Sequence, residues 1–129
     1  MAQKTVIRPP GLPDSGSPLS RAIRAGDFVF VSGTPASPNP ATGELDPDIR
    51  AQVRSCLETI DTILQEAGTS LSNVVAVTSY LTDAGYFAAY NEEYRRFFPS
   101  DYPSRTTVKA ELMRPEMLVE ITVTAVVPS

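Results

Sequence analysis

The sequence predicts a single α+β domain over residues 1–129, with its elements in the order β-β-β-α-β-α-β-β. Three observations support this prediction. Two segments carry apolar residues at helical spacing, several shorter segments are rich in β-branched residues, and no break in composition separates two cores. We therefore expect a mixed sheet with two helices on one face. A chain this short has little room for a deep site of its own, so a neighbouring subunit is a candidate for one wall of any pocket.

The N-terminal third combines short strands with irregular stretches. Residues 4–8 (KTVIR) suit a short edge strand, and the Pro-, Gly- and Ser-rich run that follows excludes regular structure immediately after it. Residues 22–33 contain two β-type runs around a Gly-Asp pair, which predicts a hairpin. Residues 34–47 form a long Pro-rich loop, which suits either a functional surface loop or a plain exposed connection.

The next segment is predicted to be an amphipathic helix. Residues 48–67 place apolar side chains at helical spacing over about five turns. Asp46 or Asp48 is the candidate N-cap, and Gly68 stands where a helix is commonly terminated. Cys56 lies in the apolar stripe of this helix, so we expect it to be structural.

The second half of the chain is predicted to hold a strand, a helix and two further strands. Residues 73–81 (NVVAVTSYL) form a nearly continuous apolar run, which is typical of a strand covered on both faces. Asp83 is expected to cap a second helix that ends before Pro99. Residues 105–112 and 118–127 are the last two predicted strands.

Each of these last two strands has one apolar and one polar face. The apolar faces, expected to line the core, are Thr106, Val108, Ala110 and Leu112, and Val119, Ile121, Val123, Ala125 and Val127. The polar faces are Arg105, Thr107, Lys109 and Glu111, and Glu120, Thr122 and Thr124. Either these polar faces meet water, or they enclose a site or a subunit interface. A tight five-residue connection would put Arg105 and Glu120 on opposite faces, whereas an even-length connection or a β-bulge would bring them together.

The composition excludes several classes of function. With no His and a single Cys, the chain lacks Ser-His-Asp and Cys-His catalysis, His-metal sites and an intramolecular disulfide. Its 15 acidic against 11 basic residues, a formal net charge of -4, oppose non-specific binding to nucleic acid. No apolar run approaches the ~18 residues of a membrane span, and the N-terminus lacks an apolar signal core. We therefore expect a cytoplasmic protein that binds neither nucleic acid nor membrane and holds no metal.

Seven short segments carry a resemblance to a known family. In chain order they are FVFVSG (28–33), NPATGE (39–44), DIRAQ (48–52), EAGTS (66–70), NEEYRRFF (91–98), YPSRTTV (102–108) and LVEI (118–121). Any one of them is a weak signal, but the ordered set spans nearly the whole chain. On these segments the chain resembles the Rid (reactive intermediate deaminase, YjgF-like) family.

The resemblance implies a fold, an assembly and an activity. The fold would be chorismate-mutase-like, assembled as a homotrimer whose sheets form a central barrel and whose three clefts lie between subunits. Deaminase-type members hydrolyse enamine and imine intermediates such as 2-aminoacrylate to a 2-oxo acid and ammonia, without a cofactor or metal. The partner would then be a small 2-imino or 2-oxo carboxylate. The alternatives are a pathway-specific deaminase of a larger substrate such as 2-aminomuconate, and a non-enzymatic trimer that binds small carboxylates. A ribonuclease or translation inhibitor fits the acidic balance and the missing His least well.

Two residues match the family positions that the chemistry depends on. Arg105 matches the Arg that grips the substrate carboxylate, for which a guanidinium offers a planar, two-pronged donor. Glu120 matches the acidic residue thought to hold or activate the attacking water. The plainer interpretations are an ordinary surface Arg at the start of a strand, and a strand Glu that faces solvent or forms a salt bridge.

Other candidates follow from the same resemblance. Ser32 and Gly33 match the hairpin end where hydroxyl and backbone N–H groups approach the ligand, although Gly33 could equally serve a tight bend. Thr107 stands where many deaminase-type members have Cys. Asn91 and Phe87 resemble residues of the second helix near the shared cleft, and for Phe87 core packing is the favoured role.

The chain also departs from the family pattern at the pocket rim. Leu19 replaces a Tyr that is common in deaminase-type members, Thr34 stands where many have Gln, and Met113 where many have Pro. The candidate Arg and Glu are kept while the rim changes, so imine hydrolysis on a larger or different substrate is an open alternative.

Overall fold

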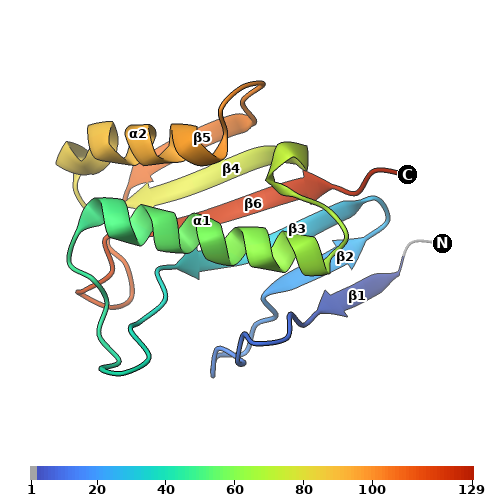
Figure 1. Cartoon of the computed structure of the whole chain (residues 1–129), viewed down its shortest axis with the longest axis horizontal. Helices are drawn as coiled ribbons and strands as arrows, with labels where there is room; N and C mark the ends of the chain where they lie inside the picture. Colours follow the sequence, from blue (N-terminus) through green and yellow to red (C-terminus); the bar gives the residue numbers. More distant parts are fainter. Residues whose placement is uncertain (1–2) are drawn as a thin grey trace.

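The computed structural model describes residues 3–129 and consists of one six-stranded sheet with two helices on one of its faces (Figure 1). The helices are α1 (Ile49–Glu66) and α2 (Phe87–Phe97), with the short 3-10 turns η1 (Leu71–Asn73) after α1 and η2 (Ala84–Tyr86) before α2. The strands are β1 (Lys4–Ile7), β2 (Ala22–Ala25), β3 (Phe28–Pro35), β4 (Val74–Leu81), β5 (Ser104–Lys109) and β6 (Val119–Val126). The predicted α+β class and order of elements are confirmed.

The strands lie in the order β1-β2-β3-β6-β4-β5. All neighbours are antiparallel except β4 and β5, which are parallel because α2 carries the chain back between them. The predicted hairpin joins β2 to β3, and Gly26 takes a φ of +59°, a conformation open to glycine in such turns. The last strand in the sequence therefore occupies the centre of the sheet, and β5 forms one edge.

Helix α1 lies along the middle of the sheet and covers β3 and β6 (Figure 1). The Asp48 carboxylate accepts a hydrogen bond from the Ala51 N–H and caps the helix, as predicted. Gly68, with a φ of +84°, follows its end. The residues of α1 that are fully buried in the core are Val53, Cys56, Leu57, Ile60, Ile63 and Leu64. Burial raises the pKa of the Cys56 thiol, which keeps it protonated and inert.

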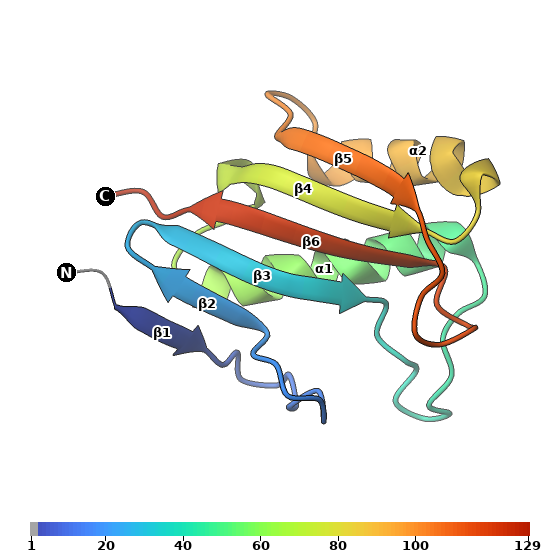
Figure 2. The ribbon, with the colours of Figure 1, turned by 180° about the vertical axis from the view of Figure 1, so that it is seen from behind.

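The opposite face of the sheet carries no helix (Figure 2). Phe28 and Phe30 of β3 point to this open face and are 44% and 49% exposed. The prediction that residues 73–81 are covered on both faces was wrong for the single chain. The reason is that only the Val77 and Ser79 side of β4 meets the helices, while side chains such as Thr78 are half-buried on the open face.

Strand β5 faces the other way from the prediction. Arg105 pairs with Val77 and Thr107 pairs with Ser79 of β4, so these two polar residues point toward α2. Val108, which was expected to line the core, is 39% exposed on the open face. The alternation of polar and apolar residues predicted the wrong inner face, because β5 is an edge strand. Its helix side is covered by aromatic side chains of α2 rather than by the aliphatic core.

A buried amide fastens the connection between β5 and β6 to the start of α1. The Gln52 Nε2 donates to the carbonyl oxygens of Asp46 at 2.8 Å and Glu116 at 3.0 Å. Its Oε1 accepts from the Leu118 N–H at 2.9 Å. Gln52 is 1% exposed, and these bonds satisfy the buried amide while holding a loop that is distant in sequence.

A buried carboxylate ties the two helices together. Glu93 of α2 is 4% exposed, and its Oε1 accepts hydrogen bonds from Arg54 of α1 at 2.5 Å and from Arg96 at 3.3 Å. Arg50 of α1 lies 3.8 Å from its Oε2. Burial alone would raise the pKa of the Glu93 carboxyl, but the hydrogen bond and charge of Arg54, together with Arg96, outweigh burial and hold that pKa below its usual value. Glu93 therefore stays ionised at neutral pH and clamps α2 against α1.

Replacing Glu93 by Gln is expected to lower the free energy of unfolding by about 1–2 kcal/mol at pH 7, because hydrogen bonds from charged donors are lost. The pKa of Glu93 is lowered on folding, so its stabilisation is complete above the unfolded-state pKa and is lost as pH falls through the folded-state pKa. Urea unfolding of wild type and variant should therefore give values that converge below about pH 4. Glu92→Gln is the matched control, because Glu92 is exposed and pairs with Arg50 alone. Equal losses in the two variants would contradict the clamp.

Candidate functional site

Arg105 lies on the helix side of β5, against a stack of aromatic rings. Its guanidinium carbon is 4.8 Å from the centroid of the Tyr94 ring, 5.1 Å from that of Tyr90 and 5.7 Å from that of Phe87. Contacts of this kind attract a cation through the ring quadrupole and leave its N–H donors free. Within residues 3–129, Arg105 forms no ion pair. The side chain is thus fixed in position with its charge unneutralised.

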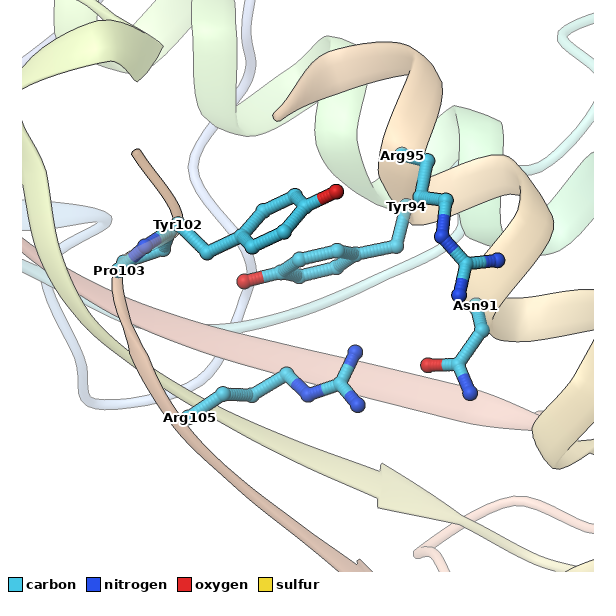
Figure 3. A pocket seen from close by; sticks show the side chains of 6 residues that line it. All are labelled: Asn91, Tyr94, Arg95, Tyr102, Pro103 and Arg105. Atoms are coloured by element: carbon cyan, nitrogen blue, oxygen red, sulfur yellow. The ribbon is translucent and has the colours of Figure 1, made fainter. Parts of the chain in front are cut away.

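Arg105 opens into a pocket of about 280 Å³ between α2 and the start of β5, here called the arginine pocket. Its lining residues are Asn91, Tyr94, Arg95, Tyr102, Pro103 and Arg105. Figure 3 shows the ends of the Arg105 and Arg95 side chains turned toward the space beside Asn91. The lining contains two guanidinium groups and no acidic side chain, so the pocket favours anions.

Two buried phenols lie behind the guanidinium of Arg105. The Tyr90 hydroxyl is hydrogen-bonded to the Ser79 hydroxyl at 2.5 Å, and burial raises the pKa of the Tyr90 phenol. Burial, with the neighbouring Tyr90 phenol, raises the pKa of Tyr94 to about 12. The Tyr94 hydroxyl and the Thr107 hydroxyl are buried and have no hydrogen-bond partner in the part of the chain that the structure describes. Buried polar atoms of this kind usually have a partner, so these two hydroxyls are exceptions in this fold.

Glu120 lies on the open face of β6, opposite Tyr80 of β4 and Pro35 of β3. It is half-buried and makes no ion pair with any other described residue. A Cβ atom at Gly33 would lie 2.5 Å from the Glu120 Oε2 and 3.0 Å from its Cδ, so glycine is what leaves room for the carboxylate. The family-matched glycine therefore has a steric role beyond a tight bend.

Glu120 borders a groove of about 460 Å³, here called the glutamate groove. Among its lining residues are Leu19, Ser32, Gly33, Met113, Arg114, Met117 and Glu120. The register of β3 against β6 shifts between Val31 and Thr34, which leaves Ser32 and Gly33 outside the regular ladder. The Ser32 hydroxyl donates to the Ser20 carbonyl at 2.6 Å and so holds the segment that carries Leu19.

The structure thus divides the predicted site residues into separate groups. Arg105 and Asn91 share the arginine pocket, while Ser32, Gly33, Leu19 and Glu120 share the glutamate groove. Thr107 and Phe87 line a third, smaller depression of about 210 Å³ beside η2. Within one chain, Arg105 and Glu120 lie on opposite faces of the sheet. The register argument from a tight five-residue connection was wrong in its premise, because β4 lies between β5 and β6 and the two strands do not pair. The favoured core role of Phe87 was wrong, because its ring is 44% exposed and packs against Arg105.

Sequence reasoning missed four residues around Arg105. They are Tyr90, Tyr94, Arg95 and Tyr102. A signal was present, since Phe87, Tyr90 and Tyr94 fall at helical spacing and form an aromatic stripe on α2. Tyr102 and Arg95 gave no such signal, because only the packing of α2 on β5 brings them to the same pocket.

Over the described residues 3–129, no group of three or more His, Cys, Asp or Glu side chains is arranged to hold a metal ion. Neither helix in this part of the chain has the length and apolarity needed to cross a membrane.

Comparisons with known proteins identify relatives of this chain both by sequence and by fold. The family model described as Endoribonuclease L-PSP matches residues 12–127. A RutC family protein of Pyrococcus horikoshii is 40% identical over 119 residues, which are 92% of this chain and 94% of that protein. A structure from Yersinia pestis, of the conserved Rid protein family, has 33% identity and a TM-score of 0.88 and covers 97% of this chain and 100% of that one. A YjgF family structure from Mycobacterium tuberculosis has 32% identity and a TM-score of 0.81, again over 97% and 100%. The chain therefore belongs to the endoribonuclease L-PSP family, which is also called the YjgF/Rid family.

Proposed function

We propose that this protein is a deaminase that hydrolyses small 2-imino acids, or the enamines in equilibrium with them, to 2-oxo acids and ammonia. The observation that carries the proposal is that Arg105 is held in place while its charge stays unpaired. Three aromatic rings hold its guanidinium, and no carboxylate of the described chain neutralises it. A planar guanidinium held in this way is suited to bind a substrate carboxylate through two parallel hydrogen bonds.

Glu120 is the group we assign to the attacking water. Water adds to the imine carbon to give a carbinolamine, and the collapse of that intermediate expels ammonia and leaves the 2-oxo acid. A carboxylate can take the proton from the water in the first step and return it to the leaving nitrogen in the second. Glu120 forms no ion pair within residues 3–129, so it is available for this role.

The two groups act on one substrate only if two chains meet. Arg105 faces α2 and Glu120 faces away from it, so one chain alone does not bring them together. The open face offers exposed Phe28, Phe30 and Val108, apolar side chains that suit burial against another copy. We therefore propose a homotrimer in which Arg105 of one subunit and Glu120 of another border the same cleft.

The description of the family model names RNA cleavage, but this chain supports that function less well. Its formal net charge is -4, which opposes the phosphate contacts on which RNA binding depends. The positive charge described above is confined to a small pocket of about 280 Å³, which suits a small acid better than a polynucleotide. Cleavage of RNA by protein carrying both Arg105→Ala and Glu120→Gln, in a nuclease-free preparation, would reopen this alternative.

Replacing Arg105 by Lys is expected to lower kcat/KM for 2-iminopropionate by about 10- to 100-fold, because Lys keeps the charge but loses the two-pronged hydrogen bond. The imine is generated in place by an amino-acid oxidase, and ammonia release is followed. Arg24→Lys on β2 is the matched control and should leave the rate unchanged. An Arg105→Lys protein with the wild-type kcat/KM would contradict the assignment of Arg105 to the substrate carboxylate.

Glu120→Gln is expected to lower kcat by at least about 100-fold with little change in KM, because the proton acceptor is lost while the volume is kept. Gly33→Ala should lower kcat in the same direction, since its Cβ would displace the Glu120 carboxylate. The melting temperature of Gly33→Ala should change little, because the displaced atoms are the free end of a flexible side chain. Unchanged kcat in both variants would contradict the role of Glu120.

A shared site predicts complementation between inactive chains. When Arg105→Ala and Glu120→Gln chains are unfolded and refolded together in equal amounts, about one quarter of the clefts of a trimer should combine an intact Arg105 with an intact Glu120. Ammonia release should recover to about that fraction of the wild-type rate. Refolding Arg105→Ala with the double variant is the control and should recover nothing. Failure of the first mixture to regain activity would contradict a site shared between subunits.

A further inference from the structure

The arginine pocket carries more positive charge than one carboxylate requires. Arg105 accounts for the carboxylate beside the imine in the function proposed above. Arg95, one helical turn beyond Asn91, adds a second guanidinium to the same lining, and the pocket has no acidic side chain to balance it. A ligand with a single carboxylate therefore contacts only one of the two guanidinium groups, and Glu120 of another subunit, which the proposed function assigns to the water, does not supply the contact to Arg95.

Arg95 is unpaired, whereas the arginines near it on the two helices form ion pairs. Arg50 pairs with Glu92, and Arg54 and Arg96 pair with Glu93. Arg95 forms neither an ion pair nor a side-chain hydrogen bond with the described residues. It nevertheless lies between Glu93 and Arg96 in the sequence, and those two residues pair with each other. It points instead toward the pocket, as Figure 3 shows. Its placement on the pocket face of α2 thus separates it from the clamp that joins the helices.

The rest of the lining supplies one neutral polar side chain near the two charges. The Tyr94 hydroxyl is not part of this group, because it is buried and points toward Pro103, away from Asn91 and Arg95 (Figure 3). Asn91 offers a side-chain amide between Arg105 and Arg95 in the view of Figure 3. The volume of about 280 Å³ lies just below the range of roughly 300–1,000 Å³ that is usual for small-molecule pockets. The pocket thus suits a short-chain acid with acceptor atoms at both ends.

We propose that the preferred substrates are 2-imino acids that carry a second carboxylate at the far end of a short side chain. Arg105 binds the carboxylate next to the imine, and Arg95 binds the terminal carboxylate with the help of the Asn91 amide. This inference rests on the proposed function for the role of Arg105, and it adds a specificity-determining role for Arg95. Each guanidinium group of the pocket then meets one carboxylate of the ligand, and Glu120 of another subunit stays with the attacking water.

Binding of two stable 2-oxo acids tests the inference without requiring turnover. 2-Oxoglutarate and 2-oxopentanoate have the same number of carbons and differ in the terminal carboxylate. Isothermal titration at pH 7.5 and fixed ionic strength should give a Kd about fivefold lower for 2-oxoglutarate with wild-type protein, as expected for an ion pair on an accessible arginine. In Arg95→Gln the ratio of the two Kd values should fall close to one. Arg95→Lys should keep part of the preference, because it keeps the charge.

Arg96→Gln is the matched control, since it removes the same charge from the next residue but from the clamp face of α2. It should retain the wild-type ratio, which separates a contact in the pocket from a general effect of net charge. A wild-type ratio of one, or a preference that survives in Arg95→Gln, would overturn the inference. A preference lost equally in Arg96→Gln would overturn it too.

The same two ligand types separate this inference from the proposed function. The imines of glutamate and 2-aminopentanoate are generated by amino-acid oxidases, and the release of ammonia is measured for each. Hydrolysis of both imines at equal kcat/KM, with equal Kd values for the two oxo acids, would leave the deaminase standing and overturn the role of Arg95. Preferential binding of 2-oxoglutarate through Arg95 without hydrolysis of either imine would support the Arg95 contact and overturn the deaminase.

Discussion

The alternation of side chains across a β-sheet is the constraint on which the candidate site depends. Strand β6 lies between β3 and β4, and β5 pairs with β4 alone at the edge. The registers of these pairs put Glu120 on the open face and Arg105 on the helix face. A shift of one residue would exchange the faces of a strand: in β6 it would bury Glu120 in the aliphatic core, and in β5 it would move Arg105 to the open face. The separation of the two groups is therefore fixed by the same pairing that forms the core.

Most of the fold could be predicted from local patterns. The α1 stripe, the Asp48 cap, the hairpin between β2 and β3 and the core face of β6 all follow from spacing and residue type. The orientation of β5 could not be predicted in this way, because Thr106 and Val108 alternate as core residues do. Only its position at the sheet edge, under the aromatic side chains of α2, determines which side faces the helices.

The residues of the candidate site could be selected from the sequence, but their grouping into two separate cavities could not. Arg105 and Glu120 stand out from family-like segments, and Gly33 proves to be the residue that leaves space for the Glu120 carboxylate. The aromatic surroundings of Arg105 depend on how α2 packs on β5, which sequence spacing alone does not specify. Cations held by aromatic rings keep their hydrogen-bond donors, whereas cations held by carboxylates do not, and the first arrangement is the one found at Arg105.

Helix α2 has two faces, one that lines the arginine pocket and one that pairs with α1. One face carries Asn91, Tyr94 and Arg95 into the arginine pocket, and the other carries Glu93 into its ion pairs with α1. Because the clamp fixes the helix from the far side, an exposed residue of the pocket face such as Arg95 can change without loosening the fold, whereas Tyr94 is 4% exposed and belongs to the core. The charge of the pocket is thereby uncoupled from the stability of the helix, but its shape is not.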